Sequence, residues 1–158
     1  MTDRVELQTE VDARRADVFA LLSTTDGLRI WLDDADIEPR VGGAVRLRLR
    51  DSEAQGTVLA FDPPQHIGFT FDWVDEPLGR SSVLAFDVID HGARAHVTLR
   101  HVGLPTRAQV ELHDHLWRHW LRRFEDAVRA QPAAVETPPA VDRRISGRTT
   151  PPRAEAPR

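Results

Sequence analysis

The sequence predicts an α+β fold in which a curved antiparallel sheet of about six to seven strands wraps around one long C-terminal helix. Three observations predict it. Most segments alternate apolar and polar residues, as strands with one buried face do. Short turn-like sequences separate these segments, so successive strands must be antiparallel neighbours. Two short helical patterns follow the first strand, and a long helical pattern ends the series.

Each element has its own local signal. VELQTEV (5–11) alternates strictly and is expected to be the first strand. Two short helices should follow, one over 16–22 and one that begins at Thr24 or Thr25 and ends near Trp31. The long helix should run from about Thr106 to Ala130, with Thr106 as its N-cap. The other strands are expected at 35–38, where the pattern is weak, and at 44–49, 56–61, 66–73, 82–89 and 95–102.

Length and composition limit the classes of function. At 158 residues, the chain has room for one domain. It has no cysteine and no lysine, which excludes disulfides, thiolate catalysis and Schiff-base chemistry. Its net charge of −4 argues against a nucleic-acid partner. No apolar run approaches the ~20 residues of a membrane helix, so we expect a cytoplasmic protein without a membrane partner. We expect no cofactor.

The composition changes after Ala130. Residues 131–158 hold six of the eleven prolines, no aromatic residue, and five arginines against three acids. Such a segment buries too little apolar surface to offset the entropy lost on ordering. We therefore predict one folded domain over residues 1–130 and a disordered tail over residues 131–158.

The segment HDHLWRHW (113–120) carries three histidines, two of which have a spacing that suits a metal site. His115 and His119 stand four residues apart, as the two histidines of a helical metal site do. At about 100° per residue, both fall on the polar, solvent side of the helix, among Arg118, Arg122 and Asp126. We therefore predict no metal site. His113 falls instead near the centre of the apolar face.

The inner faces of the sheet and the last helix are expected to line a cavity for a ligand. Strand alternation and helical phase place these residues there: Phe69, Phe71, Trp73, Phe86, His101, His113, Trp117 and Trp120. His101 and His113 would be polar points in an apolar pocket, or packed histidines with satisfied hydrogen bonds. No serine or acid is spaced to complete a catalytic set with them, so no catalytic residue is assigned.

Five stretches stand in order along residues 5–130: VFALLSTTDGLRIWL (18–32), RVGGAVRL (40–47), GTVLAFDPPQHIGFTFDW (56–73), VTLRHVGL (97–104) and LHDHLWRHWLRRF (112–124). In this order they resemble the START-like, helix-grip superfamily (the SRPBCC group), and within it the branch similar to the activator of the heat-shock-protein-90 ATPase. The resemblance implies that Trp31 covers one end of the cavity and that Gly42-Gly43 turns the chain into the third strand. His101 resembles the histidine that ends the last strand. Trp117 resembles the tryptophan of the last helix, which glycine commonly precedes in place of Leu116.

The resemblance implies a broad function. Members of the superfamily bind hydrophobic small molecules in the cavity, and the branch is named for a co-chaperone domain. We favour a non-catalytic binder of a small apolar molecule. Two alternatives stay open. One is a protein-interaction module that acts on a chaperone or regulator through the acidic segment 33–38 and the tail. The other is an enzyme of the cyclase, aromatase or hydrolase kind that uses His101, His113 and Asp72 or Asp75.

Overall fold

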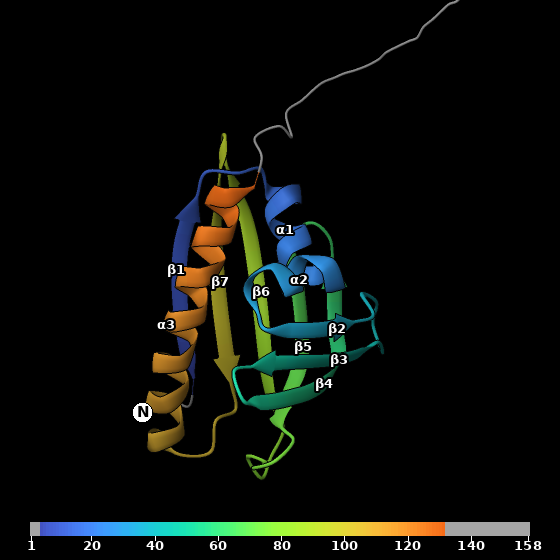
Figure 1. The fold of residues 1–158 in the computed structure, drawn as a ribbon, viewed down its shortest axis with the longest axis vertical. Coiled ribbons are helices and arrows are strands. Elements are labelled where there is room, and N and C mark those ends of the chain that lie inside the picture. Colours follow the sequence, from blue (N-terminus) through green and yellow to red (C-terminus); the bar gives the residue numbers. More distant parts are fainter. Residues whose placement is uncertain (1–3, 132–158) are drawn as a thin grey trace, which may run out of the picture. The chain divides into compact units, whose positions relative to one another are not determined.

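The computed structural model describes residues 4–131. Contacts divide the chain into one unit that ends at Val128 and another that begins at Arg129. Within the described residues, all seven strands and nearly the whole of the last helix belong to the first unit (Figure 1). The predicted tail lies outside the described residues from position 132 onward, and that prediction stays untested.

The elements follow the predicted order, and most of their ends agree within two residues. The described chain forms β1 (Val5–Val11), α1 (Arg15–Ser23), α2 (Thr25–Trp31), β2 (Asp34–Ile37), β3 (Ala44–Leu49), β4 (Ser52–Asp62), β5 (His66–Trp73), β6 (Ser82–His91), β7 (Arg94–Val102) and α3 (Arg107–Ala130). The exception is β4, which begins at Ser52, four residues before its predicted start. No helix among the described residues has the length and apolar character needed to cross a membrane.

The early start of β4 comes from a tight β3–β4 hairpin. Leu49 pairs directly with Ser52, which leaves Arg50 and Asp51 as a two-residue turn. Arg50 has a φ of 62°, in the left-handed region that residues other than glycine seldom adopt. Its backbone N–H donates to the carboxylate of Asp33 at 2.7 Å, which holds the turn. A turn was expected between the predicted strands 44–49 and 56–61, and it is shorter than expected because Ser52–Gln55 already pair with β3.

The strands form one antiparallel sheet in the order β1-β7-β6-β5-β4-β3-β2. Strands β2 to β7 form a meander, and β1 joins its edge by pairing with β7. In Figure 1, β2, β3 and β4 run across the direction of β1 and β7, so the sheet is strongly curved. The long helix α3 lies against one face of this sheet. The predicted α+β class, with a curved antiparallel sheet around a C-terminal helix, is confirmed.

The helical phase predicted for α3 agrees with the structure. The helix buries His113, Trp117, Trp120, Leu121, Phe124, Ala127 and Val128. His115 is exposed and His119 is partly exposed on the other side. The hydroxyl of Thr106 accepts the backbone N–H of Gln109 at 3.1 Å, as expected of the N-cap residue. Gly42 has a φ of 86°, which agrees with the predicted turn before β3.

Gly56 lets β4 pass close to β5, and this contact generates a stability prediction. A Cβ at Gly56 would lie 1.7 Å from the carbonyl oxygen of Thr70, whereas a Cβ at Gly68 would meet nothing nearer than 3.6 Å. Both glycines lie inside strands, and neither has a positive φ. We predict that Gly56→Ala lowers the free energy of unfolding by about 1–3 kcal/mol or more, because backbone must shift, while Gly68→Ala has a smaller effect. Urea denaturation measures both variants, and equal losses would contradict the close contact at Gly56.

Candidate functional site

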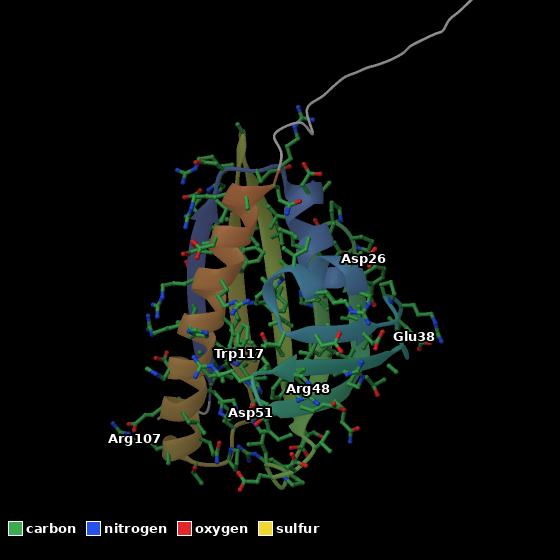
Figure 2. The ribbon with its side chains drawn as sticks, in the orientation of Figure 1. Asp26, Glu38, Arg48, Asp51, Arg107 and Trp117 are labelled. Carbon is green, nitrogen blue, oxygen red and sulfur yellow. The ribbon has the colours of Figure 1, made fainter. Side chains whose placement is uncertain are left out.

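The predicted cavity residues gather between the sheet and α3. Eight of the nine are buried, and Trp73 is half-buried. Five of them form one group of touching rings, called the aromatic cluster below, with centroid separations from 4.8 to 6.4 Å: Phe71, Trp73, His101, His113 and Trp117. Trp117 projects from the side of α3 that faces the sheet (Figure 2).

The other four predicted residues lie outside the aromatic cluster. Trp31 packs edge-on against Phe86 and against Phe124, which was not predicted as a site residue. The indole N–H of Trp31 donates to the carbonyl of Leu21 at 2.8 Å. Phe69 is buried in β5, and Trp120 is buried on α3 beneath the guanidinium of Arg123. All four residues belong to the buried core: Trp31, Phe69, Phe86 and Trp120.

A chain of hydrogen bonds fixes the protonation of His101. The indole N–H of Trp117 donates to His101 Nδ1 at 3.0 Å, so this nitrogen carries a lone pair. The hydroxyl of Ser82 donates to the carbonyl of Phe71, and its oxygen lies 2.9 Å from His101 Nε2. His101 Nε2 must therefore carry the hydrogen and donate it to Ser82. His101 is neutral, and both of its ring nitrogens are satisfied.

His113 is the opposite tautomer. Its Nδ1 lies 2.7 Å from the carbonyl oxygen of Gln109, which only accepts, so Nδ1 carries the hydrogen. Its Nε2 accepts the indole N–H of Trp73 at 3.0 Å. Each histidine thus receives a hydrogen bond from a tryptophan and donates one elsewhere. The two rings lie edge-to-face with centroids 5.0 Å apart.

The surroundings favour the neutral form of both histidines. Burial, and then the proximity of His113, lower the pKa of His101 from 6.5 to about 3. Burial also lowers the pKa of His113, and its hydrogen bond to the Gln109 carbonyl opposes this shift. The lowered pKa of His113 agrees with its position on the apolar face of α3. At neutral pH these side chains offer hydrogen-bond acceptors and donors without charge.

The acids named in the enzyme hypothesis do not join the histidines by any hydrogen bond seen among the described residues. The Asp72 carboxylate accepts the backbone N–H of Leu78 at 2.7 Å and so holds the loop after β5. Asp75 lies exposed in that loop.

The partners of the two histidines that sequence reasoning missed are Ser82 and the backbone carbonyl of Gln109. Gln109 lies four residues before His113, a helical spacing that signals a hydrogen bond, whereas Ser82 becomes identifiable only once β6 is paired with β5 and β7.

A curved antiparallel sheet that holds one long helix, with an aromatic interior between them, defines the helix-grip class of START-like proteins. The family model described as "Activator of Hsp90 ATPase homolog 1-like protein" matches residues 12–129. The chain belongs to this family. Among proteins of curated function, none matches the chain.

Solved structures share the fold at low sequence identity. One is the crystal structure of a protein from Mesorhizobium loti, which is 17% identical in sequence and has a TM-score of 0.73. The matched region covers 81% of this chain and 98% of that protein's chain. An HSP90 activator from Plasmodium falciparum is 17% identical, with coverage of 78% and 94% and a TM-score of 0.69. CalU16 from Micromonospora echinospora is 18% identical, with coverage of 84% and 78% and a TM-score of 0.67. These similarities show the fold alone.

The neutral state of His101 generates a prediction about pH. Above pH 6.5 its contribution to stability is complete, because the histidine is neutral in both the folded and the unfolded chain. As the pH falls from 6.5 toward 3, the unfolded chain takes up a proton that the folded chain does not, and stability falls by up to about 1.4 kcal/mol per pH unit. We predict that His101→Gln reduces the proton uptake on unfolding at pH 5 by about one proton. The slope of the free energy of unfolding against pH measures this proton uptake.

The matched control is His115→Gln, which makes the same chemical change on the exposed side of α3. Glutamine at position 101 keeps one acceptor for Trp117 and one donor for Ser82, so the variant is expected to fold. Equal changes of slope in the two variants would show that burial of His101 does not cause the effect.

Proposed function

We propose that the protein binds a small apolar molecule with one hydrogen-bond donor, at the outer end of the aromatic cluster. The observation that carries this proposal is the hydrogen bond from Trp73 to His113 at a partly exposed position. Trp73 alone among the five cluster residues is not fully buried. Because the cluster rings touch one another, a ligand gains access by displacing the ring that is least enclosed.

Apolar side chains surround this end of the cluster. Val110 and Leu116 lie one helical turn before and after His113, and both are half-buried against the core. Leu78, in the loop after β5, is half-buried in the same way. Its backbone N–H is held by Asp72, so the loop is anchored to the end of β5. A ligand beside Trp73 would therefore exchange water for apolar contacts, which is typical of small-molecule sites.

The tautomer of His113 determines the polar chemistry of the ligand. Its Nδ1–H stays bound to the Gln109 carbonyl within α3. When the Trp73 indole moves aside, Nε2 becomes an acceptor without a partner. A ligand hydroxyl is suited to restore that bond, whereas an apolar molecule of the same shape leaves a buried acceptor unpaired. The preferred ligand thus has an aromatic or aliphatic body with a hydroxyl group.

The experiment compares 2-naphthol with naphthalene by equilibrium dialysis. We predict that the protein binds 2-naphthol about two- to thirteenfold more tightly than naphthalene, since one hydrogen bond contributes about 0.5–1.5 kcal/mol. His113→Leu should abolish this preference, and His115→Leu, on the exposed side of the same helix, should keep it. Trp73→Phe removes the competing donor and should raise the affinity for 2-naphthol. Equal binding of both compounds by the unmodified protein would refute the proposal.

A second candidate function, binding to an acidic protein partner, is favoured by the charge on the outer side of α3. Partial burial, followed by the positive charges of Arg50, Arg123 and Arg122, lowers the pKa of His119. These like charges crowd one surface, and an acidic partner would relieve their repulsion. The acidic segment 33–38 is a weaker candidate surface. Ion pairs with Arg29 and Arg46 already neutralise its Asp34 and Asp36.

The family name suggests a chaperone ATPase as the assay for this second function. If α3 docks on such a chaperone, Arg122→Glu combined with Arg123→Glu should abolish any stimulation of its ATPase rate. Arg107→Glu, in the first turn of α3 and paired with Glu111, is the matched control. Stimulation that persists in the double variant would exclude this surface.

A further inference from the structure

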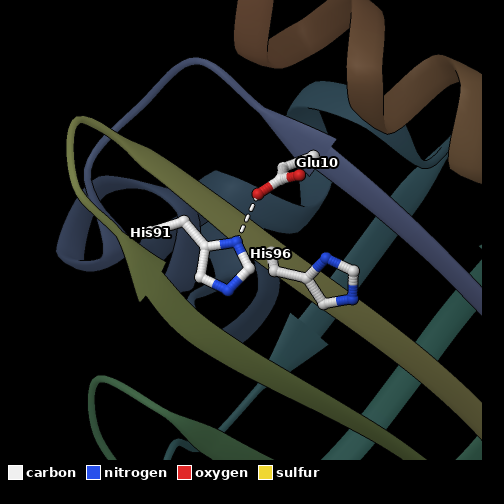
Figure 3. A group of neighbouring side chains, drawn as sticks. All are labelled: Glu10, His91 and His96. Atoms are coloured by element: carbon white, nitrogen blue, oxygen red, sulfur yellow. Dashed lines mark hydrogen bonds and ion pairs between the residues drawn. The ribbon is translucent and has the colours of Figure 1, made fainter.

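Three potential metal ligands meet on the face of the sheet that α3 does not cover. Glu10 from β1, His91 from β6 and His96 from β7 each offer one ligand atom, and these atoms lie within 4.8 Å of one another. Figure 3 shows the carboxylate of Glu10 above the two imidazole rings. Glu10 and His91 are exposed and His96 is partly exposed, so an ion can reach them from solvent.

Strand pairing holds these side chains together. Glu10 and His96 are direct partners in the β1–β7 ladder, which places their side chains on the same face about 5 Å apart at Cβ. His91 and Arg94 are partners at the end of the β6–β7 ladder, so a two-residue turn containing Gly92 joins the strands. His91 is therefore fixed diagonally beside His96. The ligand positions depend on regular backbone pairing rather than on a flexible loop.

Hydrogen bonds orient the side chains of the three potential ligands. The side-chain oxygen of Gln8 lies 3.1 Å from His96 Nε2 and only accepts, so Nε2 carries the hydrogen and Nδ1 carries the lone pair. A second partner that fixes the tautomer in this way is typical of metal-binding histidines. His91 Nδ1 and the Glu10 carboxylate already share a short hydrogen bond. A cation would take the place of the hydrogen between them.

The two arginines on this face near the three ligands are paired with carboxylates. Arg94, the strand partner of His91, pairs with Asp12 at 2.8 Å. Further along the same face, Arg100 pairs with Glu6 and with Asp87. Each arginine thus has a carboxylate of its own, and Glu10 is paired with His91.

We propose that Glu10, His91 and His96 form a binding site for a divalent first-row transition-metal cation, such as Zn²⁺. Two imidazoles and one carboxylate are a ligand set that zinc prefers, and three protein ligands leave a fourth position open to water. Ligand atoms around tetrahedral zinc lie about 3.3 Å apart, given bonds of about 2.0–2.1 Å, so modest rotations of exposed side chains complete the site. The bound ion would tie β1 to β6 and β7. The site is separate from the aromatic cluster and does not depend on the proposed ligand.

The test uses the full chain without a histidine tag, stripped of metal, and titrated with Zn²⁺ against a coloured chelator. We expect one equivalent of bound zinc and a higher melting temperature in its presence. His96→Ala and Glu10→Gln should each weaken binding at least about tenfold. Glu6→Gln, on the same face of β1, is the matched control for the loss of a carboxylate and should bind zinc normally.

A double variant, His115→Ala with His119→Ala, separates this site from the helical histidine pair. Zinc binding should survive in the double variant, and zinc should shift the ring-nitrogen NMR signals of His91 and His96. Loss of zinc binding in the double variant, with retention in His96→Ala, would overturn the proposal. Less than one equivalent of zinc on the unmodified protein at micromolar concentrations would overturn it as well.

Discussion

The hydrogen bond from Trp117 to His101 holds α3 against the sheet, and the arrangement of the interior depends on it. It begins a directed series in which Trp117 donates to His101, His101 to Ser82, and Ser82 to the carbonyl of Phe71. All these groups are buried, so each unmade bond would cost about 1–3 kcal/mol. Rotation of α3 by one residue would move the Trp117 indole away from His101. The series therefore selects one register of the helix on the sheet, which apolar contacts alone specify less strictly.

The aromatic cluster contains a second tryptophan–histidine pair of different character. His101 is bonded on both sides to buried groups, Ser82 of the sheet and Trp117 of α3. His113 is bonded to a carbonyl of its own helix and to Trp73, which is partly exposed. Both pairs join α3 to the sheet, because His101 lies in β7 and Trp73 in β5. Breaking the first pair leaves fully buried groups unpaired, whereas breaking the second frees one acceptor at the edge of the core. The same two side-chain types thus form a fully buried pair at one position and a partly exposed pair at the other.

Local patterns in the sequence were sufficient for most of the fold. Alternation located the strands, and the helical phase of 106–130 placed His113 inside and His115 outside, as observed. The start of β4 was missed because Arg50 takes a left-handed conformation that its own side chain does not favour; the Asp33 carboxylate, 17 residues away, supports it. The tautomers of His101 and His113 were also beyond the sequence, since they depend on the direction in which each partner donates. Strand and helix phase identify the residues that face inward, but not which atoms meet.

Sequence spacing was least informative for the group on the outer face of the sheet. His115 and His119 have the spacing of a helical metal site, yet they lie on a helix face among arginines. Glu10 and His91 are 81 positions apart, and no local motif connects them. They meet because β1 pairs with β7 and β7 pairs with β6, so the register of two ladders converts distant positions into neighbours. The pairing of β1 with β7 also buries Val5, Leu7 and Val11 on the face that covers α3. The strand pairing that builds the inner face therefore also brings Glu10, His91 and His96 together on the opposite face.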